Sequence, residues 1–131
     1  MTSDDLKVTR LENGAIVRLD IPGGELTRST ASKFSDHCSK IAQDRDIKIV
    51  VVSSVGTDFC VGAAKDLGRD KIVPDPASAL AAVPVPVIGL FSGKCYSVGL
   101  EIALCCDIRV GLRNSCLLYT SDAADDSLRV D

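Results

Sequence analysis

Two hydrophobic runs constrain the fold of this chain more than any other feature of its sequence. Residues 47–53 have the sequence IKIVVVS, and residues 85–91 have the sequence VPVIGLF. A strand with one covered face alternates apolar and polar side chains, whereas a parallel strand covered on both faces is hydrophobic throughout. The two runs therefore predict buried parallel strands, and parallel strands are usually connected by helices.

A β-hairpin is predicted ahead of the first run. Residues 6–11 and 15–21 have strand-like composition, and Asn13-Gly14 between them tolerates the positive φ angles of a tight hairpin turn. The second strand of the hairpin alternates, which predicts one buried face and one solvent-facing face. Its apolar positions are Val17, Leu19 and Ile21, and its polar positions are Arg18 and Asp20.

The remaining elements complete an α/β pattern. Residues 27–43 predict an amphipathic helix, residues 97–106 a short helix and residues 107–112 a third strand. Helices and strands alternate after residue 25, which is typical of the α/β class with a mostly parallel sheet. The 131 residues, 46% of them hydrophobic, suit a single domain with a real core. The apolar stripe of the long helix consists of Ala31, Phe34, Cys38 and Ile41.

Charge and cysteine usage exclude several classes of function. The net charge is −3 and no basic run is present, so the sequence indicates neither nucleic-acid nor membrane binding. His37 is the only imidazole, and we interpret it as a boundary residue. The cysteines form no CxxC pair, which argues against a zinc site and indicates a reducing, cytoplasmic compartment. They are Cys38, Cys60, Cys95, Cys105, Cys106 and Cys116.

Two glycine-containing loops follow the buried strands. The first is GTDFCVGAAKDL, residues 56–67, in which residues 63–65 are expected to open a helical turn. The second is SGKCYSVGLE, residues 92–101, which leads into the short helix. In α/β sheets ligands bind beyond the carboxyl ends of the strands, where helix N-termini present unpaired N–H groups. The pair of loops predicts either an oxyanion hole or two ordinary strand-to-helix connections.

Glu101 is the single charged residue between Cys95 and Cys106. A carboxylate in so apolar a run costs free energy to bury unless something uses it or pairs with it. One interpretation is a general base, because an apolar pocket favours proton uptake by a carboxylate. The alternative is a glutamate at a helix edge that reaches solvent or pairs with Lys94 or Arg109.

The two loops and their strands carry a resemblance to a known family. The segments VVVSSVGTDFCVGAAKDL and PVPVIGLFSGKCYSVGLEIALCCDIRV resemble the enoyl-CoA hydratase/isomerase (crotonase) family, and the similarity runs from about residue 7 to residue 115. The resemblance implies the N-terminal half of a crotonase-like ββα spiral. It also implies that the backbone N–H groups of Ala63 and Val98 hold a thioester oxygen, with Glu101 as the catalytic acid or base. The other implied substrate-binding residues are Val61, Gly62, Ala64 and Gly99.

Several positions depart from the family pattern. Ala64 replaces an aspartate that often follows the first donor, and Ser97 and Val98 occupy positions where glycine is usual. The segment 64–97, which normally lines the acyl pocket, is short. The family's second acid should fall near Ser121, where the sequence TSDAADD does not match.

The last residues are different in kind from the rest. From Cys116 onward, CLLYTSDAADD resembles a translated sequencing adaptor. We interpret residues 1–115 as a truncated crotonase-like domain and residues 116–131 as an aberrant tail, and we expect the chain as given to lack turnover.

These features together favour hydration of an α,β-unsaturated acyl-CoA. The alternatives are an enoyl-CoA or dienoyl-CoA double-bond isomerase, a non-catalytic acyl-CoA-binding relative and a cysteine-based redox protein. The resemblance implies no cofactor or metal beyond the coenzyme A of the substrate. It also implies that the full-length protein forms a homotrimer or hexamer.

Overall fold

The parallel sheet predicted from the sequence is present. The computed structural model describes residues 5–67 and 75–118. Five strands lie in the order β1-β2-β4-β6-β8, with β1 antiparallel to β2 and the other neighbours parallel. This confirms the α/β class with a mixed, mostly parallel sheet. The strands are β1 (Lys7–Leu11), β2 (Ile16–Ile21), β4 (Ile49–Ser54), β6 (Val87–Phe91) and β8 (Ile108–Gly111).

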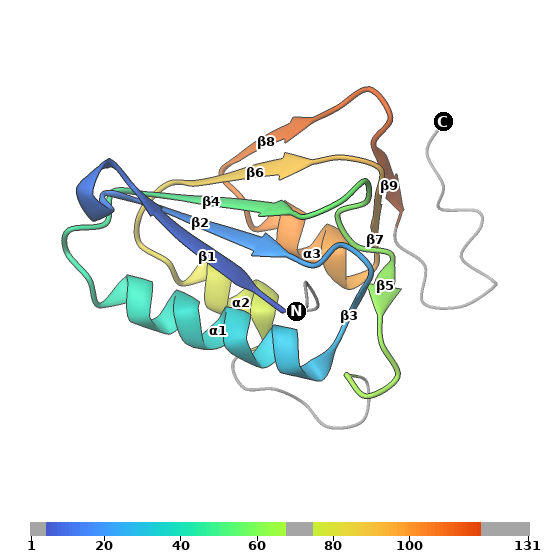
Figure 1. Ribbon diagram of the computed structural model, residues 1–131, viewed down its shortest axis with the longest axis horizontal. Helices are drawn as coiled ribbons and strands as arrows, with labels where there is room; N and C mark the ends of the chain where they lie inside the picture. The colour runs from blue at the N-terminus through green and yellow to red at the C-terminus, as the bar shows by residue number, and fades with distance from the viewer. Residues whose placement is uncertain (1–4, 68–74, 119–131) are drawn as a thin grey trace.

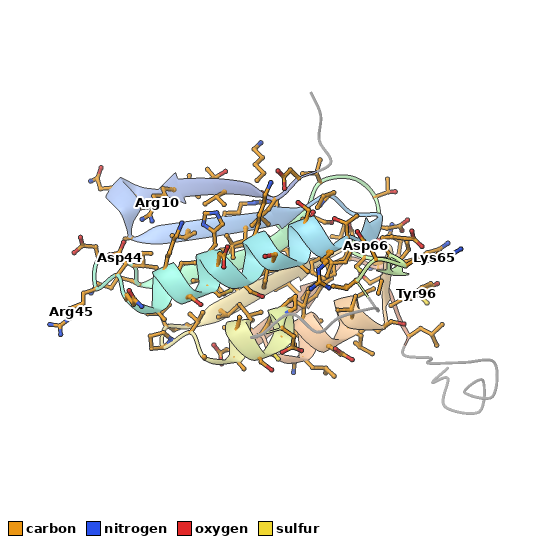
Figure 2. The ribbon with its side chains drawn as sticks, turned by 90° about the horizontal axis from the view of Figure 1, so that it is seen from below. Arg10, Asp44, Arg45, Lys65, Asp66 and Tyr96 are labelled. Carbon is orange, nitrogen blue, oxygen red and sulfur yellow. The ribbon has the colours of Figure 1, made fainter. Side chains whose placement is uncertain are left out.

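The helices of the described residues cover one face of this sheet, as Figures 1 and 2 show from two directions. They are α1 (Arg28–Ala42), α2 (Pro76–Ala81) and α3 (Val98–Leu104). The Thr27 side chain accepts a hydrogen bond from the Thr30 N–H at 3.2 Å and so caps α1. Asp75 caps α2 in the same way through the Ser78 N–H, also at 3.2 Å. All four residues of the predicted apolar stripe of α1 are buried against the sheet.

The prediction that the hydrophobic strands are covered on both faces was wrong for β4 and also for β6, in which Ile88 and Leu90 are only half-buried. Val50 and Val52 point toward the helices and are fully buried, whereas Ile49 and Val51 are only half-buried. Among the described residues, helices lie on one face alone, so every second side chain of β4 faces a side without a covering layer. Continuous hydrophobicity therefore identified the strand correctly but not its surroundings.

Asp20 was predicted to face solvent, and it is buried instead, with 6% of its surface exposed. Its strand lies inside the sheet, between β1 and β4, so neighbouring strands shield it. The Arg18 guanidinium compensates the buried charge, since its Nε lies 3.0 Å from Asp20 Oδ2. Alternation correctly predicts that Arg18 and Asp20 share one face of β2, but it does not reveal that Asp20 is buried there.

The hairpin prediction is confirmed. Strands β1 and β2 pair with Leu11 opposite Ile16, and a short 3-10 turn, Glu12–Gly14, connects them. Asn13 and Gly14 have φ angles of 57° and 91°, the region for which this dipeptide was singled out.

Four very short strands were missed by sequence analysis. They form two small parallel sheets beyond the carboxyl ends of the main strands (Figure 1). The expected helical turn at residues 63–65 was wrong, because Gly62 and Ala63 pair in one of these strands. Residues 116–118, which begin the segment interpreted as a tail, pair in another, and residues 119–131 lie outside the described part. The strands are β3 (Glu25–Leu26), β5 (Gly62–Ala63), β7 (Lys94–Tyr96) and β9 (Cys116–Leu118).

Candidate functional site

The two predicted loops meet beyond the ends of β4 and β6. The Phe59 N–H donates to the Ser92 carbonyl at 2.9 Å and to the Lys94 carbonyl at 3.0 Å. The Cys60 N–H also donates to Lys94, and the Tyr96 N–H donates back to the Cys60 carbonyl at 2.9 Å. This short parallel ladder fixes the register of one loop against the other.

Gly99 brings the start of α3 against the first loop. A Cβ atom at position 99 would lie 2.5 Å from Cys60 Cβ and 3.1 Å from Cys60 Sγ. Cys60 is fully buried, so it has no space into which it can move. The contact between α3 and the first loop therefore requires glycine at position 99.

The first predicted donor, Ala63, lies in β5 and is exposed. The next residue, Ala64, donates its N–H to the Leu26 carbonyl of β3 at 2.9 Å. Ala63 itself pairs with Leu26 in the parallel register of β3 and β5, and the use of its N–H as a donor to a substrate stays a prediction. Gly62 has a φ of +135°, and this bend turns the chain into the short strand. Sequence analysis missed the part played by Leu26 because a two-residue strand has no periodic signal.

The second predicted donor, Val98, is the first residue of α3. A helix gives no internal acceptor to the N–H groups of its first turn. Within residues 5–67 and 75–118 the Val98 N–H makes no hydrogen bond. The two residues predicted as donors thus lie on adjoining segments, one on β5 and one at the start of α3. Such a pair suits an oxygen that gains negative charge during a reaction.

Glu101 lies one turn into α3, where its N–H donates to the Ser97 carbonyl at 3.0 Å. Its half-buried carboxylate makes no hydrogen bond or ion pair with a described residue. Arg109, one of the two cations considered as its partner, donates instead to backbone carbonyls, the nearest of them that of Cys106 at 2.9 Å. The edge ion pair considered from the sequence is therefore not formed among these residues.

The comparisons with known proteins agree with the sequence motifs. No protein-family model matches the chain. A protein named as a probable enoyl-CoA hydratase of Mycobacterium leprae is 34% identical over 93 residues, which are 66% of this chain and 35% of that protein. An enoyl-CoA hydratase structure from Mycobacterium avium subsp. paratuberculosis has a TM-score of 0.74 and 28% identity, covering 86% of this chain and 46% of that one.

Another solved structure shares the fold over almost the whole chain. The structure of an enoyl-CoA hydratase/carnithine racemase from Magnetospirillum magneticum has a TM-score of 0.78 at 23% identity and covers 98% of this chain. The chain belongs to the enoyl-CoA hydratase/isomerase family. It spans about a third of the length of the curated relative and about half of the solved ones, consistent with the family's N-terminal half.

The structure brings some of the family-implied residues together. Gly62 and Ala63 of β5 and Gly99 of α3 lie on the two segments that pack around Cys60. Val61 and Ala64, both half-buried, flank β5 and anchor it through hydrogen bonds to Gly24 and Leu26. Their roles toward a substrate remain predictions.

Ser97 holds a strained backbone next to the second donor. Its φ is 51° and its ψ is −113°, a conformation that glycine adopts freely and other residues rarely do. We expect Ser97→Gly to stabilise the protein by about 1 kcal/mol, the relief of strain being reduced by the extra entropy of unfolded glycine. Urea denaturation measures this. Ser39→Gly, in the exposed part of α1, is the control and should destabilise; equal losses for both variants would contradict the strain argument.

The cysteines do not form a reactive site among the described residues. Burial raises the pKa of the Cys95 and Cys106 thiols to about 12 and also raises that of Cys60. The thiolate is the nucleophile, so these groups are poorly reactive near neutral pH. The cysteine-based redox alternative therefore gains no support. Within the described residues no group of histidine, cysteine or acidic side chains is arranged to hold a metal ion, and no helix is long and apolar enough to cross a membrane.

Proposed function

We propose that the protein binds acyl-CoA thioesters and promotes the addition of water to an α,β-unsaturated acyl-CoA. The observation that carries the proposal is the placement of Ala63 and Val98 on adjoining segments, with the Glu101 carboxylate, which has no partner among the described residues, one turn beyond Val98. Membership of the enoyl-CoA hydratase/isomerase family supports it.

The chemistry follows from these three groups. Glu101 takes a proton from water while the water oxygen forms a bond to the β-carbon of the substrate. The electron pair of the double bond moves toward the thioester, whose oxygen gains negative charge. The Ala63 and Val98 N–H groups stabilise that charge, a contribution of several kcal/mol in a dry site. Protonated Glu101 then returns a proton to the α-carbon, and one water has been added.

A second candidate, an acyl-CoA-binding protein without turnover, is favoured by the side chain at Val98. Relatives commonly have glycine there, and a Cβ atom beside the donor narrows the approach of a thioester. The same donors also suit a double-bond isomerase, in which Glu101 moves a proton between two carbons of the acyl chain.

Two assays on the full-length protein, whose N-terminal half the chain matches, separate these candidates. Calorimetry with butyryl-CoA should show binding with a Kd between about 1 µM and 1 mM, the usual range of substrate affinities. Loss of the enoyl absorbance of crotonyl-CoA then reports hydration, and conversion of 3-hexenoyl-CoA reports isomerisation. Binding without either reaction would assign the protein to the non-catalytic class, and absence of binding at 1 mM would overturn the proposal.

The remaining properties of the functional protein are also proposals. We propose that it needs no resident cofactor, because the chemistry uses only proton transfer and hydrogen bonding. We propose a cytoplasmic location and, for the full-length protein, a homotrimer or hexamer.

A further inference from the structure

We propose that Asp58 is a positioning residue that holds the two oxyanion donors at a fixed separation. Its meaning for catalysis rests on the function proposed above, whereas its effect on the two loops can be measured independently. Neither the motifs nor the family resemblance assigned a role to this residue.

Asp58 links the first loop to the second through its carboxylate. Its Oδ1 accepts a hydrogen bond from the Lys94 N–H at 2.9 Å, at the first residue of β7. Its own carbonyl accepts from the Ser54 hydroxyl at 3.0 Å, at the last residue of β4. One residue therefore connects the end of a core strand with the start of the second loop. Hydrogen bonds to an ionised acceptor are the stronger ones in proteins.

The second loop is shaped around this carboxylate. A Cβ atom at Gly93 would lie 2.2 Å from Asp58 Oδ1 and 2.2 Å from the Thr57 carbonyl oxygen. Gly93 also has a φ of +62°, which other residues rarely adopt. Absence of a side chain and a left-handed backbone are both needed for the loop to approach Asp58 so closely.

The hydrogen bond from the Lys94 N–H to Asp58, called the clamp below, lies a few residues before both donors in the sequence. Asp58 precedes Ala63 in the first loop, and Lys94 precedes Val98 in the second. Between clamp and donors the loops run side by side through the ladder that ends with the Tyr96 N–H on the Cys60 carbonyl. Loosening the clamp should therefore change the separation of the donors without removing either of them.

Two substitutions separate the hydrogen bond from the charge. Asp58→Ala removes the acceptor, whereas Asp58→Asn keeps an oxygen at the same place without the charge. Asp44→Ala is the matched control, because Asp44 Oδ1 also accepts a backbone N–H, that of Asp46 at 3.0 Å. Asp44 lies at the opposite end of the molecule from Tyr96, as Figure 2 shows.

Amide hydrogen exchange tests the clamp whether or not the protein binds acyl-CoA. The reporter is the Tyr96 N–H, which Asp58 does not contact. We expect its exchange to accelerate about tenfold in Asp58→Ala, to stay near the wild-type rate in Asp58→Asn, and to be unchanged in Asp44→Ala. Unchanged exchange in Asp58→Ala would overturn the proposal. If that variant fails to fold, Asp58→Asn still decides, since exchange of the Tyr96 N–H about tenfold faster than in wild type would also overturn the proposal.

The infrared frequency of the thioester carbonyl of bound butyryl-CoA reports whether the clamp affects the donors. Paired donors polarise the thioester carbonyl and lower its infrared frequency, a signature that thermal stability alone does not change. We expect a smaller shift in Asp58→Ala than in wild type and recovery of the shift in Asp58→Asn. A full shift in Asp58→Ala would overturn the positioning role. Failure of the wild-type protein to bind butyryl-CoA would instead overturn the proposed function, while the exchange result for Asp58 would stand.

Discussion

Replacing Glu101 with glutamine should lower the rate of water addition by about 100-fold or more, the usual contribution of a positioned general base. Glutamine has nearly the same shape but cannot take a proton from water. Because the carboxylate has no partner among the described residues, its removal should leave no unpaired cation and little change in stability.

The measurement is crotonyl-CoA hydration by the full-length protein, with butyryl-CoA binding as the reference for an intact site. Glu12→Gln is the control, since Glu12 is exposed in the turn between β1 and β2. We expect Glu101→Gln to reduce kcat with KM little changed, which identifies a group that acts in the transition state. Retention of full turnover in Glu101→Gln would assign the base to another residue.

Much of the fold could be predicted from local sequence signals. Alternation in residues 15–21, the Asn13-Gly14 turn and the apolar stripe of residues 27–43 each reflect a short-range physical rule, and each appears in the structure. Asp20 shows the limit of such rules. Alternation places Arg18 and Asp20 on the same face, but the burial of Asp20 depends on the neighbouring strands β1 and β4, which the local pattern does not show.

The site was predictable in its residues but not in its assembly. The glycine-containing loops and Glu101 stand out in the sequence because their composition breaks the hydrophobic pattern around them. The contacts that join the loops connect residues far apart in the chain, such as Asp58 with Lys94 and Cys60 with Gly99. The short strands that carry Ala63 and Tyr96 have two and three residues, too few for a period to be visible.

The second large effect is expected from Gly99→Ala. The added methyl group would lie 2.5 Å from Cys60 Cβ, so α3 must move away from the first loop. Overpacking of this kind destabilises by about 1–3 kcal/mol. It should also separate the Val98 donor from the Ala63 donor, and a displacement near 1 Å can lower a rate by about 100-fold.

Gly89→Ala provides a control that overpacks the core away from the contact between Gly99 and Cys60. A Cβ at position 89 would lie 2.3 Å from Phe91 Cζ and 2.8 Å from Cys106 Sγ, beneath the far end of α3. Both variants should lose stability in urea denaturation. Only Gly99→Ala should also lose crotonyl-CoA hydration and the infrared shift of bound butyryl-CoA.

The paired comparison distinguishes geometry from stability. If activity follows stability, the two variants should fall equally at equal loss of unfolding free energy, and the two-donor site would be contradicted. If activity follows donor separation, Gly99→Ala should be far less active than Gly89→Ala at the same stability. The second outcome is expected because the donors are backbone groups, whose positions depend on how closely α3 packs against the first loop.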